Sequence, residues 1–329
     1  MARKKSDLED YQAISPVPRG KVLLESAFNA YRQSRDKAKN TKYKTTLTRS
    51  KNIAKESIKS FSKSARKQLQ NITEDFPRAE ELDKVMLDLV QIDYDINDIK
   101  INLGNINWAH DNIRNIEVLH QKKLSRCGDE GEIEKIKKSF IGRASSLLKQ
   151  IDKSFTFLEN YRRYLKELPV LKDDYVTVAI AGFPNVGKST LLSKLTKAKP
   201  EVNIYPFTTK GLNLGTVVKD KARLQLIDTP GTLNRPEKMN DIEKKAYIII
   251  RHSDIIIYIF DPTLSYSLSK QKTLLEEIKK MNPEAKIITY ISKTDIIPNY
   301  RENLTEEIVD TSVHSAFSLL DSIFQTKSR

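Results

Sequence analysis

Apolar residues recur at helical spacing through most of the first half of the chain. From about residue 21 to Leu168 they return every three or four positions, as on the buried face of an α-helix. Each amphipathic segment is expected to begin at or near one residue, and these residues are Val22, Ser50, Pro77, Ile106 and Ile133. The last segment is expected to be the longest helix, running towards Leu165. Short links between long amphipathic helices predict an antiparallel bundle over residues 21–168.

Turn-forming residues bound this helical region. Residues 1–20 end in Pro16, Pro18 and Gly20 and are expected to form an irregular N-terminal segment. At the other end, Pro169 disfavours helix at the residue before it. A domain boundary is therefore expected directly after residue 168.

Strand-like runs replace the helical spacing after Asp174. These β-branched, apolar runs are 176–181, 224–227, 255–260 and 286–291, and helical segments separate the later ones. Strands that alternate with helices in this way favour a mostly parallel sheet covered on both faces. The predicted fold class is therefore α + α/β, with the helical bundle followed by an α/β domain at residues 174–329.

A glycine-rich pattern directly follows the first of these runs. Its residues, through the start of the expected helix, are Gly182, Phe183, Pro184, Asn185, Val186, Gly187, Lys188, Ser189 and Thr190. The two glycines let the backbone wrap around a phosphate chain, so that its N–H groups point at the phosphate oxygens. Lys188 is expected to neutralise charge on the β- and γ-phosphates, and the Ser189 hydroxyl to bind Mg²⁺. With a strand before it and a helix after it, the pattern predicts a P-loop that binds a nucleotide.

The other expected contacts to Mg²⁺ and the γ-phosphate lie in two loops further along. Asp228 ends the run 224–227 in the sequence Asp-Thr-Pro-Gly, where its carboxylate can hold Mg²⁺ and the Gly231 N–H can meet the γ-phosphate. Thr209 ends the sequence Tyr-Pro-Phe-Thr-Thr and is expected to bring its hydroxyl to the same ion. The alternative for Thr209 is a threonine at the start of a strand. Lys188, Thr209 and Gly231 are the candidate catalytic residues.

A base-reading loop is expected after the run 286–291. The sequence there is Ser292-Lys293-Thr294-Asp295. The Asp295 carboxylate can accept two parallel hydrogen bonds from guanine, which adenine cannot donate. The aliphatic stem of Lys293 can lie along the base plane. This loop favours GTP as the nucleotide, and the alternative is a plain surface turn.

The last guanine-contacting loop has two candidate positions. Residues 308–311 are expected to form the final strand, which places Ser312 and Val313 in that loop. The alternative is Ser315, which matches the usual Ser-Ala pair but is expected to open the closing helix.

Positive charge is concentrated in one part of the helical region. The formal net charge is +14, and residues 31–70 contain 13 lysines and arginines against 2 aspartates and glutamates. Such a stripe attracts polyanions and releases counterions when it meets phosphates. An RNA-binding face is the favoured interpretation, and a solvated helix face or an anionic membrane surface is the alternative.

Composition narrows the classes of protein further. A charged fraction of 30% with 39% hydrophobic residues is typical of a folded soluble protein. The single cysteine, Cys127, excludes an internal disulfide and a cysteine-cluster metal site. Apolar runs such as 255–260 are far shorter than the ~20 residues that a membrane helix needs. Trp108 is expected in the core or at an interface.

The ordered motifs resemble those of the Obg-like branch of the translation-factor-class GTPases. The similarity sharpens around Arg251-His252-Ser253-Asp254, Phe260-Asp261-Pro262 and Tyr266-Ser267-Leu268. With the helical region in front, the chain resembles the nucleolar GTP-binding protein 1 family, in the short form of its archaeal members. The resemblance implies Mg²⁺-dependent binding and hydrolysis of GTP, a role in assembly of the large ribosomal subunit, and contact of the helical domain with rRNA.

This resemblance also carries expectations about partners and location. An activating protein is one candidate partner, as a source of faster hydrolysis, and we expect the free chain to be a monomer. A cytoplasmic location is expected, because a nucleolar one requires a eukaryotic source and the short length argues against that.

One departure from the family pattern lies in the base-reading motif. The motif normally starts with asparagine, and this chain has Ser292. The change removes an amide that would tie this loop to the P-loop and approach guanine N7. Because Asp295 remains, we expect weaker affinity but retained guanine preference.

A second departure concerns the attacking water. Thr232 and Leu233 follow the Asp-Thr-Pro-Gly sequence, so there is no glutamine to orient water and slow intrinsic hydrolysis is expected. A partner, a potassium ion near Asn185, or Arg235 could supply what is missing. The rival functions are a nucleotide-gated module with negligible turnover that binds a protein or membrane, and an ATPase with the same type of sheet.

Overall fold

The computed structural model describes residues 13–39, 43, 45–169, 171–172, 174–197, 213–219, 222–230, 241–297, 299–313 and 315–326. The described chain divides into two compact units. We call the unit within Asp10–Leu82 and Tyr94–Lys166 the helical unit. The other contains Asp83–Asp93 and the chain from Glu167 onward, and we call it the sheet unit.

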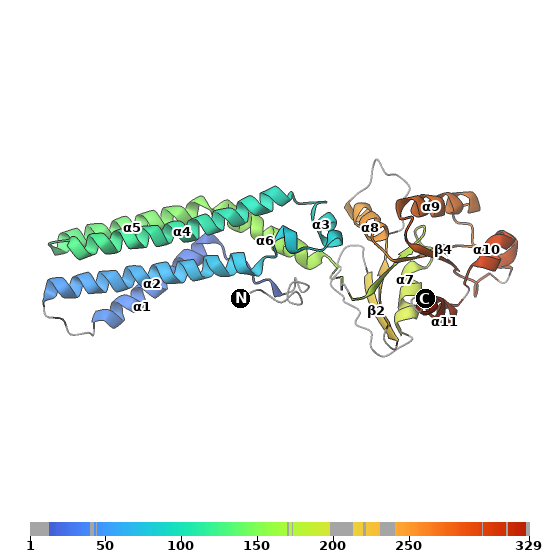
Figure 1. The fold of residues 1–329 in the computed structure, drawn as a ribbon, viewed down its shortest axis with the longest axis horizontal. Coiled ribbons are helices and arrows are strands. Elements are labelled where there is room, and N and C mark those ends of the chain that lie inside the picture. The colour runs from blue at the N-terminus through green and yellow to red at the C-terminus, as the bar shows by residue number, and fades with distance from the viewer. Residues whose placement is uncertain are drawn as a thin grey trace. The chain divides into compact units, whose positions relative to one another are not determined.

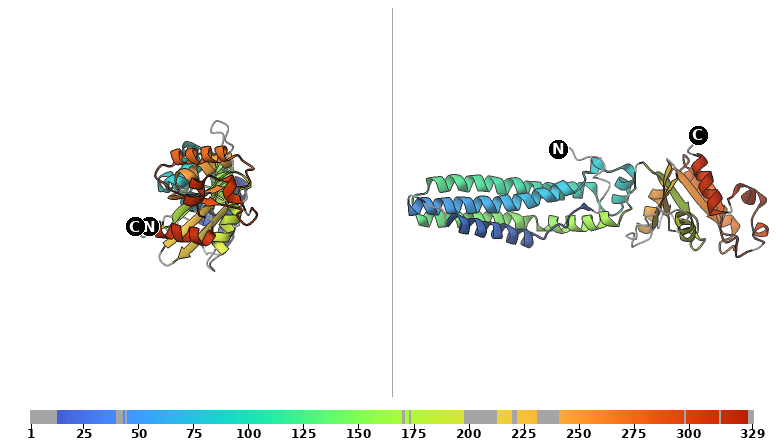
Figure 2. Two further views of the ribbon diagram at one scale, coloured as in Figure 1. Left: turned by 90° about the vertical axis from the view of Figure 1, so that its right-hand side faces the viewer. Right: turned by 90° about the horizontal axis from the view of Figure 1, so that it is seen from below.

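Long helices lie side by side in the helical unit, and successive ones run in opposite directions (Figures 1 and 2). They are α1 (Gly20–Lys39), α2 (Thr46–Asp75), α4 (Ile96–Arg126) and α5 (Glu130–Gln150), with α6 (Asp152–Glu167) continuing after α5. The fully buried Phe61 ring meets Phe28 and Phe140 edge-on, with ring centroids 5.3 and 5.5 Å away. This aromatic core confirms the predicted antiparallel bundle.

Several helix boundaries differ from the sequence expectation. Helix α2 begins at Thr46 rather than Ser50, because the Thr45 side chain accepts a hydrogen bond from the Thr48 N–H and caps the first turn. No helix begins at Pro77; a short 3₁₀ helix covers Ala79–Glu81 instead.

The expected longest helix is also interrupted. Helix α5 ends at Gln150 and α6 begins at Asp152, so the longest described helix is α4 with 31 residues. Ile151, at the break, is buried and extends the apolar period across it, which is why the pattern did not reveal the interruption. Trp108 is 45% exposed on α4, so it is not a core residue of the described fold.

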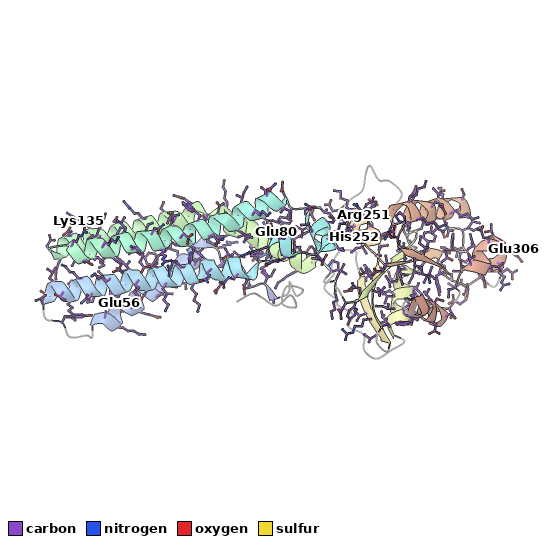
Figure 3. All side chains as sticks on the ribbon, viewed as in Figure 1. Glu56, Glu80, Lys135, Arg251, His252 and Glu306 are labelled. Carbon is purple, nitrogen blue, oxygen red and sulfur yellow. The ribbon has the colours of Figure 1, made fainter. Side chains whose placement is uncertain are left out.

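Helix α3 (Lys84–Val90) comes between α2 and α4 in the sequence but belongs to the sheet unit. The Asp83 carboxylate caps it by accepting a hydrogen bond from the Met86 N–H at 2.8 Å. Helix α3 packs on α8 (Asp241–Arg251), and Asp88 Oδ2 lies 2.8 Å from His252 Nε2. His252 directly follows α8 and is labelled in Figure 3. The expected bundle range of 21–168 includes residues 83–93, which belong to the sheet unit.

The sheet is mostly parallel, as predicted, and its strand order is β2-β3-β1-β4-β5. The strands are β1 (Val176–Ala181), β2 (Asn213–Lys219), β3 (Ala222–Asp228), β4 (Ile255–Phe260) and β5 (Lys286–Ile291). Among the strands of the described residues, β2 alone is antiparallel to its neighbour. All residues of β4 are buried, which explains why its sequence is apolar without alternation.

Helices cover both faces of this sheet. Helices α8 and α9 (Leu268–Met281) lie on one face, while α7 (Lys188–Lys197) and α11 (Ala316–Thr326) pack together on the other (Figure 1). In the described part of the chain, no helix has both the length and the apolar character for crossing a membrane.

The predicted final strand at residues 308–311 is wrong. Residues Glu306–Thr311 form helix α10, whose first turn carries the acidic Glu306 and Glu307 that favour a helix N-terminus. Ile308 and Val309 are its buried residues, and an apolar run this short does not distinguish strand from helix. Val313, after the helix, pairs in parallel with Tyr290 of β5 as an isolated bridge.

Candidate nucleotide-binding site

The glycine-rich loop joins the end of β1 to the start of α7 and has an unusual backbone. Gly182, Asn185 and Gly187 have φ angles of 149°, 61° and 98°. A Cβ on Gly182 would lie 3.1 Å from the Ile259 carbonyl oxygen of β4, so a larger residue would be crowded there as well as strained by the positive φ. These positive φ values turn the backbone sharply before α7, as a phosphate-binding loop requires.

Lys188, the first residue of α7, is buried against this loop. Its Nζ donates hydrogen bonds to the carbonyl oxygens of Gly182 at 3.1 Å and Phe183 at 2.7 Å. Burial lowers the pKa of the Lys188 ammonium, and the nearby Asp228 carboxylate opposes that shift. The loop thus holds a positive charge where phosphate oxygens would approach.

Ser189 and Asp228 meet at the carboxyl ends of two neighbouring strands. Ile180 of β1 lies opposite Asp228 in the parallel pairing with β3. The Ser189 hydroxyl donates a hydrogen bond to Asp228 Oδ2, and the Asn213 amide donates to the same oxygen at 3.3 Å. Asp228 Oδ1 is buried and has no hydrogen-bond partner among the described residues. A hydroxyl beside an unpartnered carboxylate oxygen is a donor set that suits Mg²⁺.

The base-reading candidates follow β5 and lie next to the P-loop. A Cβ placed on Gly187 would be 3.8 Å from the Ser292 Cβ. The Ser292 hydroxyl donates to the Phe260 carbonyl at 3.2 Å, and Lys293 has a left-handed φ of 56°. Asp295 is exposed beyond them, and burial together with the charge of Asp295 raises the pKa of Tyr290. The structure therefore brings the phosphate and base candidates to one edge of the sheet.

Ser312 lies further back than expected. Its side chain is buried and donates a hydrogen bond to Thr289 Oγ1 at 2.9 Å. Val313, the next residue, pairs with Tyr290 of β5, and Ser315 follows two positions later as an exposed residue directly before α11. Ser315 caps α11 there by accepting a hydrogen bond from the Ser318 N–H.

Other candidate residues lie outside the described part of the chain. These residues are Thr209, Gly231, Thr232, Leu233 and Arg235. Their expected roles remain predictions.

Two side chains beside this site, Tyr266 and Asp261, have no expected role in the nucleotide-binding motifs. The Tyr266 ring stacks on Phe183 of the P-loop, with centroids 4.2 Å apart. Asp261 follows β4 and pairs with Lys293 at 2.7 Å. An acidic residue at the carboxyl end of a parallel strand was the available signal, because functional groups gather at that edge.

Comparison with known proteins agrees with both units. Residues 11–172 match the NOG1 N-terminal helical domain, and residues 177–293 match a family described as 50S ribosome-binding GTPase. An uncharacterised protein of Methanocaldococcus jannaschii is 38% identical over 237 residues, covering 71% of this chain and 66% of that protein.

Named relatives cover nearly the whole chain. Nucleolar GTP-binding protein 1 of Drosophila melanogaster is 31% identical over 91% of this chain and 46% of its own length. The Arabidopsis thaliana protein of the same name is 30% identical over 91% of this chain and 44% of its own length. The chain thus spans about half the length of these named relatives. Its helical domain, its GTPase domain and these relatives together establish that the chain belongs to the nucleolar GTP-binding protein 1 family.

Proposed function

We propose that this chain binds GTP, hydrolyses it slowly to GDP and phosphate, and thereby acts as a switch in assembly of the large ribosomal subunit through rRNA binding. The observation that carries the nucleotide part is the convergence of Lys188 and Ser189, at the start of α7, with Asp228 at the carboxyl end of β3. A buried cation, a hydroxyl and a carboxylate in this arrangement suit a nucleotide with its magnesium ion.

In this proposal the residues of the chain bind and orient the phosphates. The N–H groups of the P-loop and the Lys188 ammonium hold the β- and γ-phosphate oxygens, and the ammonium exchanges its two carbonyl partners for them. Ser189 and Asp228 hold Mg²⁺, and we assign Thr209 as a further ligand. Bound Mg²⁺ neutralises charge that develops on the phosphates during transfer. The Gly231 N–H is assigned to the γ-phosphate.

Guanine recognition is assigned to the exposed edge of the base loop. The Asp295 carboxylate accepts hydrogen bonds from guanine, and the Lys293 stem lies along the base. For the last contact we favour Ser315 over Ser312, because Ser312 is buried whereas Ser315 is exposed.

The direct test is nucleotide binding by the full chain and by Lys188→Ala. We expect the variant to lose at least ten-fold in GTP affinity in the presence of Mg²⁺, since it lacks the buried charge. Lys194→Ala, at an exposed position of the same helix, is the matched control and should bind as the wild type does. Isothermal calorimetry with ATP as competitor checks the base: displacement of GTP by equimolar ATP would favour the ATPase alternative.

Turnover separates a switch from a gated binding module. Single-turnover hydrolysis by the wild type, measured in potassium and in sodium, should be slow and accelerated by ribosomal particles. No phosphate release under any of these conditions would support the module. Equal rates in the two salts would exclude a catalytic role for a potassium ion near Asn185.

The rRNA part of the proposal rests on the basic helix α2. Lys59, Lys63 and Lys67 recur every four residues on α2, and all three are exposed. This spacing places the charges along one face, which can follow a phosphate backbone. The GTPase family that matches residues 177–293 is described as 50S ribosome-binding, which supports a ribosomal partner for the chain.

A further inference from the structure

The loop after β4, residues 261–266, touches both candidate nucleotide loops. At one end Asp261 Oδ2 accepts a hydrogen bond from Lys293 Nζ of the base loop at 2.7 Å. At the other end Tyr266 stacks on Phe183 of the P-loop with an interplanar angle of 17°. Since β4 lies between β1 and β5 in the sheet, this loop is placed to join the two. We call residues 261–266 the bridging loop.

The contact between Asp261 and Lys293 is protected from solvent on the carboxylate side. The Asp261 side chain is 1% exposed and that of Lys293 is 23% exposed. Asp261 Oδ1 accepts a second hydrogen bond, from the Thr263 N–H at 3.0 Å. A buried carboxylate needs such partners to offset its desolvation, so the lysine ammonium is held at a defined point. The left-handed backbone of Lys293 likewise depends on surrounding contacts.

Gln271 of α9 forms hydrogen bonds with the backbone of the bridging loop. This fully buried side chain accepts a hydrogen bond from the Asp261 N–H at 2.8 Å and donates to the Asp261 carbonyl at 3.0 Å. It also donates to the Tyr266 carbonyl at 2.8 Å. One amide therefore holds both ends of the loop, at the residues that contact the nucleotide loops.

We propose that Asp261 is a positioning residue for guanine recognition: it holds Lys293, and with it the base loop, in place of the asparagine amide that this chain lacks at Ser292. The Ser292 hydroxyl bonds to the end of its neighbouring strand at Phe260, so it does not tie the base loop to the P-loop. The bridging loop makes that tie instead. This inference rests on the proposed nucleotide function, because Lys293 reads a base only if the site binds one.

The test compares a ligand that has a base with one that has none. In the full chain, Asp261→Asn should weaken GDP binding about ten-fold, the effect of removing one hydrogen bond to a charged group. Its affinity for magnesium tripolyphosphate should stay the same, because neither Asp261 nor Lys293 is among the residues assigned to the phosphates and Mg²⁺. The matched control is Glu276→Gln, which breaks the exposed pair between Glu276 and Lys279 on α9. This control should bind both ligands as the wild type does.

A second background separates positioning from general damage to the fold. Lys293→Met removes the ammonium but keeps the stem, so adding Asp261→Asn to it should cause no further loss of GDP affinity. The double variant has neither charge and therefore no unpaired buried ion. An equal loss for GDP and tripolyphosphate, or an undiminished loss in the Lys293→Met background, would overturn the proposal.

The two proposals fail in different ways. If the wild type binds neither ligand, the proposed nucleotide function is wrong and the role of Asp261 falls with it. If the wild type binds GDP and Asp261→Asn binds it equally well, only the role of Asp261 is wrong.

Discussion

Glu159 in the helical unit has partners on both sides of its carboxylate. It accepts hydrogen bonds from Arg162 at 2.8 Å, from Arg163 at 2.9 Å, and from the Val17 N–H at 3.0 Å. The Arg162 guanidinium is the largest cause of the lowered pKa of Glu159, which falls to about 2. One side chain thus ties the segment before α1 to helix α6.

This pairing predicts a pH-dependent stability. Because the pKa of Glu159 is depressed on folding, its ionised form stabilises the unit above the usual value of 4.5. That contribution is lost as the pH falls from there towards about 2. Glu159→Gln should therefore lower the free energy of unfolding by about 1–2 kcal/mol at pH 7 and by much less near pH 2. Urea denaturation followed by circular dichroism measures both values.

Glu134→Gln is the control for this measurement. It breaks a pair with Lys137 in which the glutamate side chain is 59% exposed, and such pairs contribute little. A difference between wild type and Glu159→Gln that is the same at both pH values would contradict the ionic origin of the effect.

At the scale of elements, the short helix α3 belongs to the sheet unit, although in sequence it lies between two helices of the helical unit. It has 7 residues, among which Met86, Leu89 and Val90 are buried. An isolated helix of this length is not stable in water, so tertiary packing must hold it. Its packing on α8 and the pair between Asp88 and His252 supply that support.

A substitution that weakens the packing of α3 should therefore also destabilise α8. Asp88→Asn weakens the contact to His252, so the amides at the end of α8 should exchange hydrogen about five-fold faster, as a loss of ~1 kcal/mol implies. Amides of α2 should not change. Exchange mass spectrometry of the full chain gives both, with Glu80→Gln, which pairs with Lys100 in the helical unit, as the control. Acceleration in α2 without any in α8 would show that α3 does not support α8.

At the scale of the whole molecule, positive charge and nucleotide chemistry reside in different units. The window 31–70 lies within the helical unit, whereas the P-loop and base loop lie in the sheet unit. This division is the one expected if the helical unit binds a polyanion and the sheet unit binds a nucleotide, as proposed above.

Reversing the charge of four basic residues of helix α2 tests the RNA part of the proposed function. With Arg49, Lys51, Lys55 and Lys59 changed to glutamate, binding to large-subunit rRNA should weaken at least ten-fold. Its logarithmic salt dependence should flatten by up to about 3, since each lost phosphate contact contributes ~0.7 to 0.9. The control changes Lys270, Lys272, Lys279 and Lys280 of α9 to glutamate, with the same change in net charge. Unchanged rRNA binding, or binding to anionic vesicles instead, would contradict an RNA partner.

The elements with strong periodicity were predictable from the sequence, and so was the phosphate site. The P-loop, Asp228 and the base loop are each a short segment at the end of a buried strand. Parallel strands bring such ends together at one edge of the sheet. The errors arose where a local signal was ambiguous. The run at 308–311 fits strand or helix equally, and Ile151 continues the apolar period across a helix break.

The sequence by itself determined the two-part architecture, the phosphate-binding loop and the basic stripe, because each is written in residues close together along the chain. Tertiary structure decided the position of α3, the pairing of Val313 with Tyr290, and the bridge from Asp261 to Lys293. These features depend on contacts between residues far apart in sequence. Their energies come from packing and burial, which local patterns do not encode.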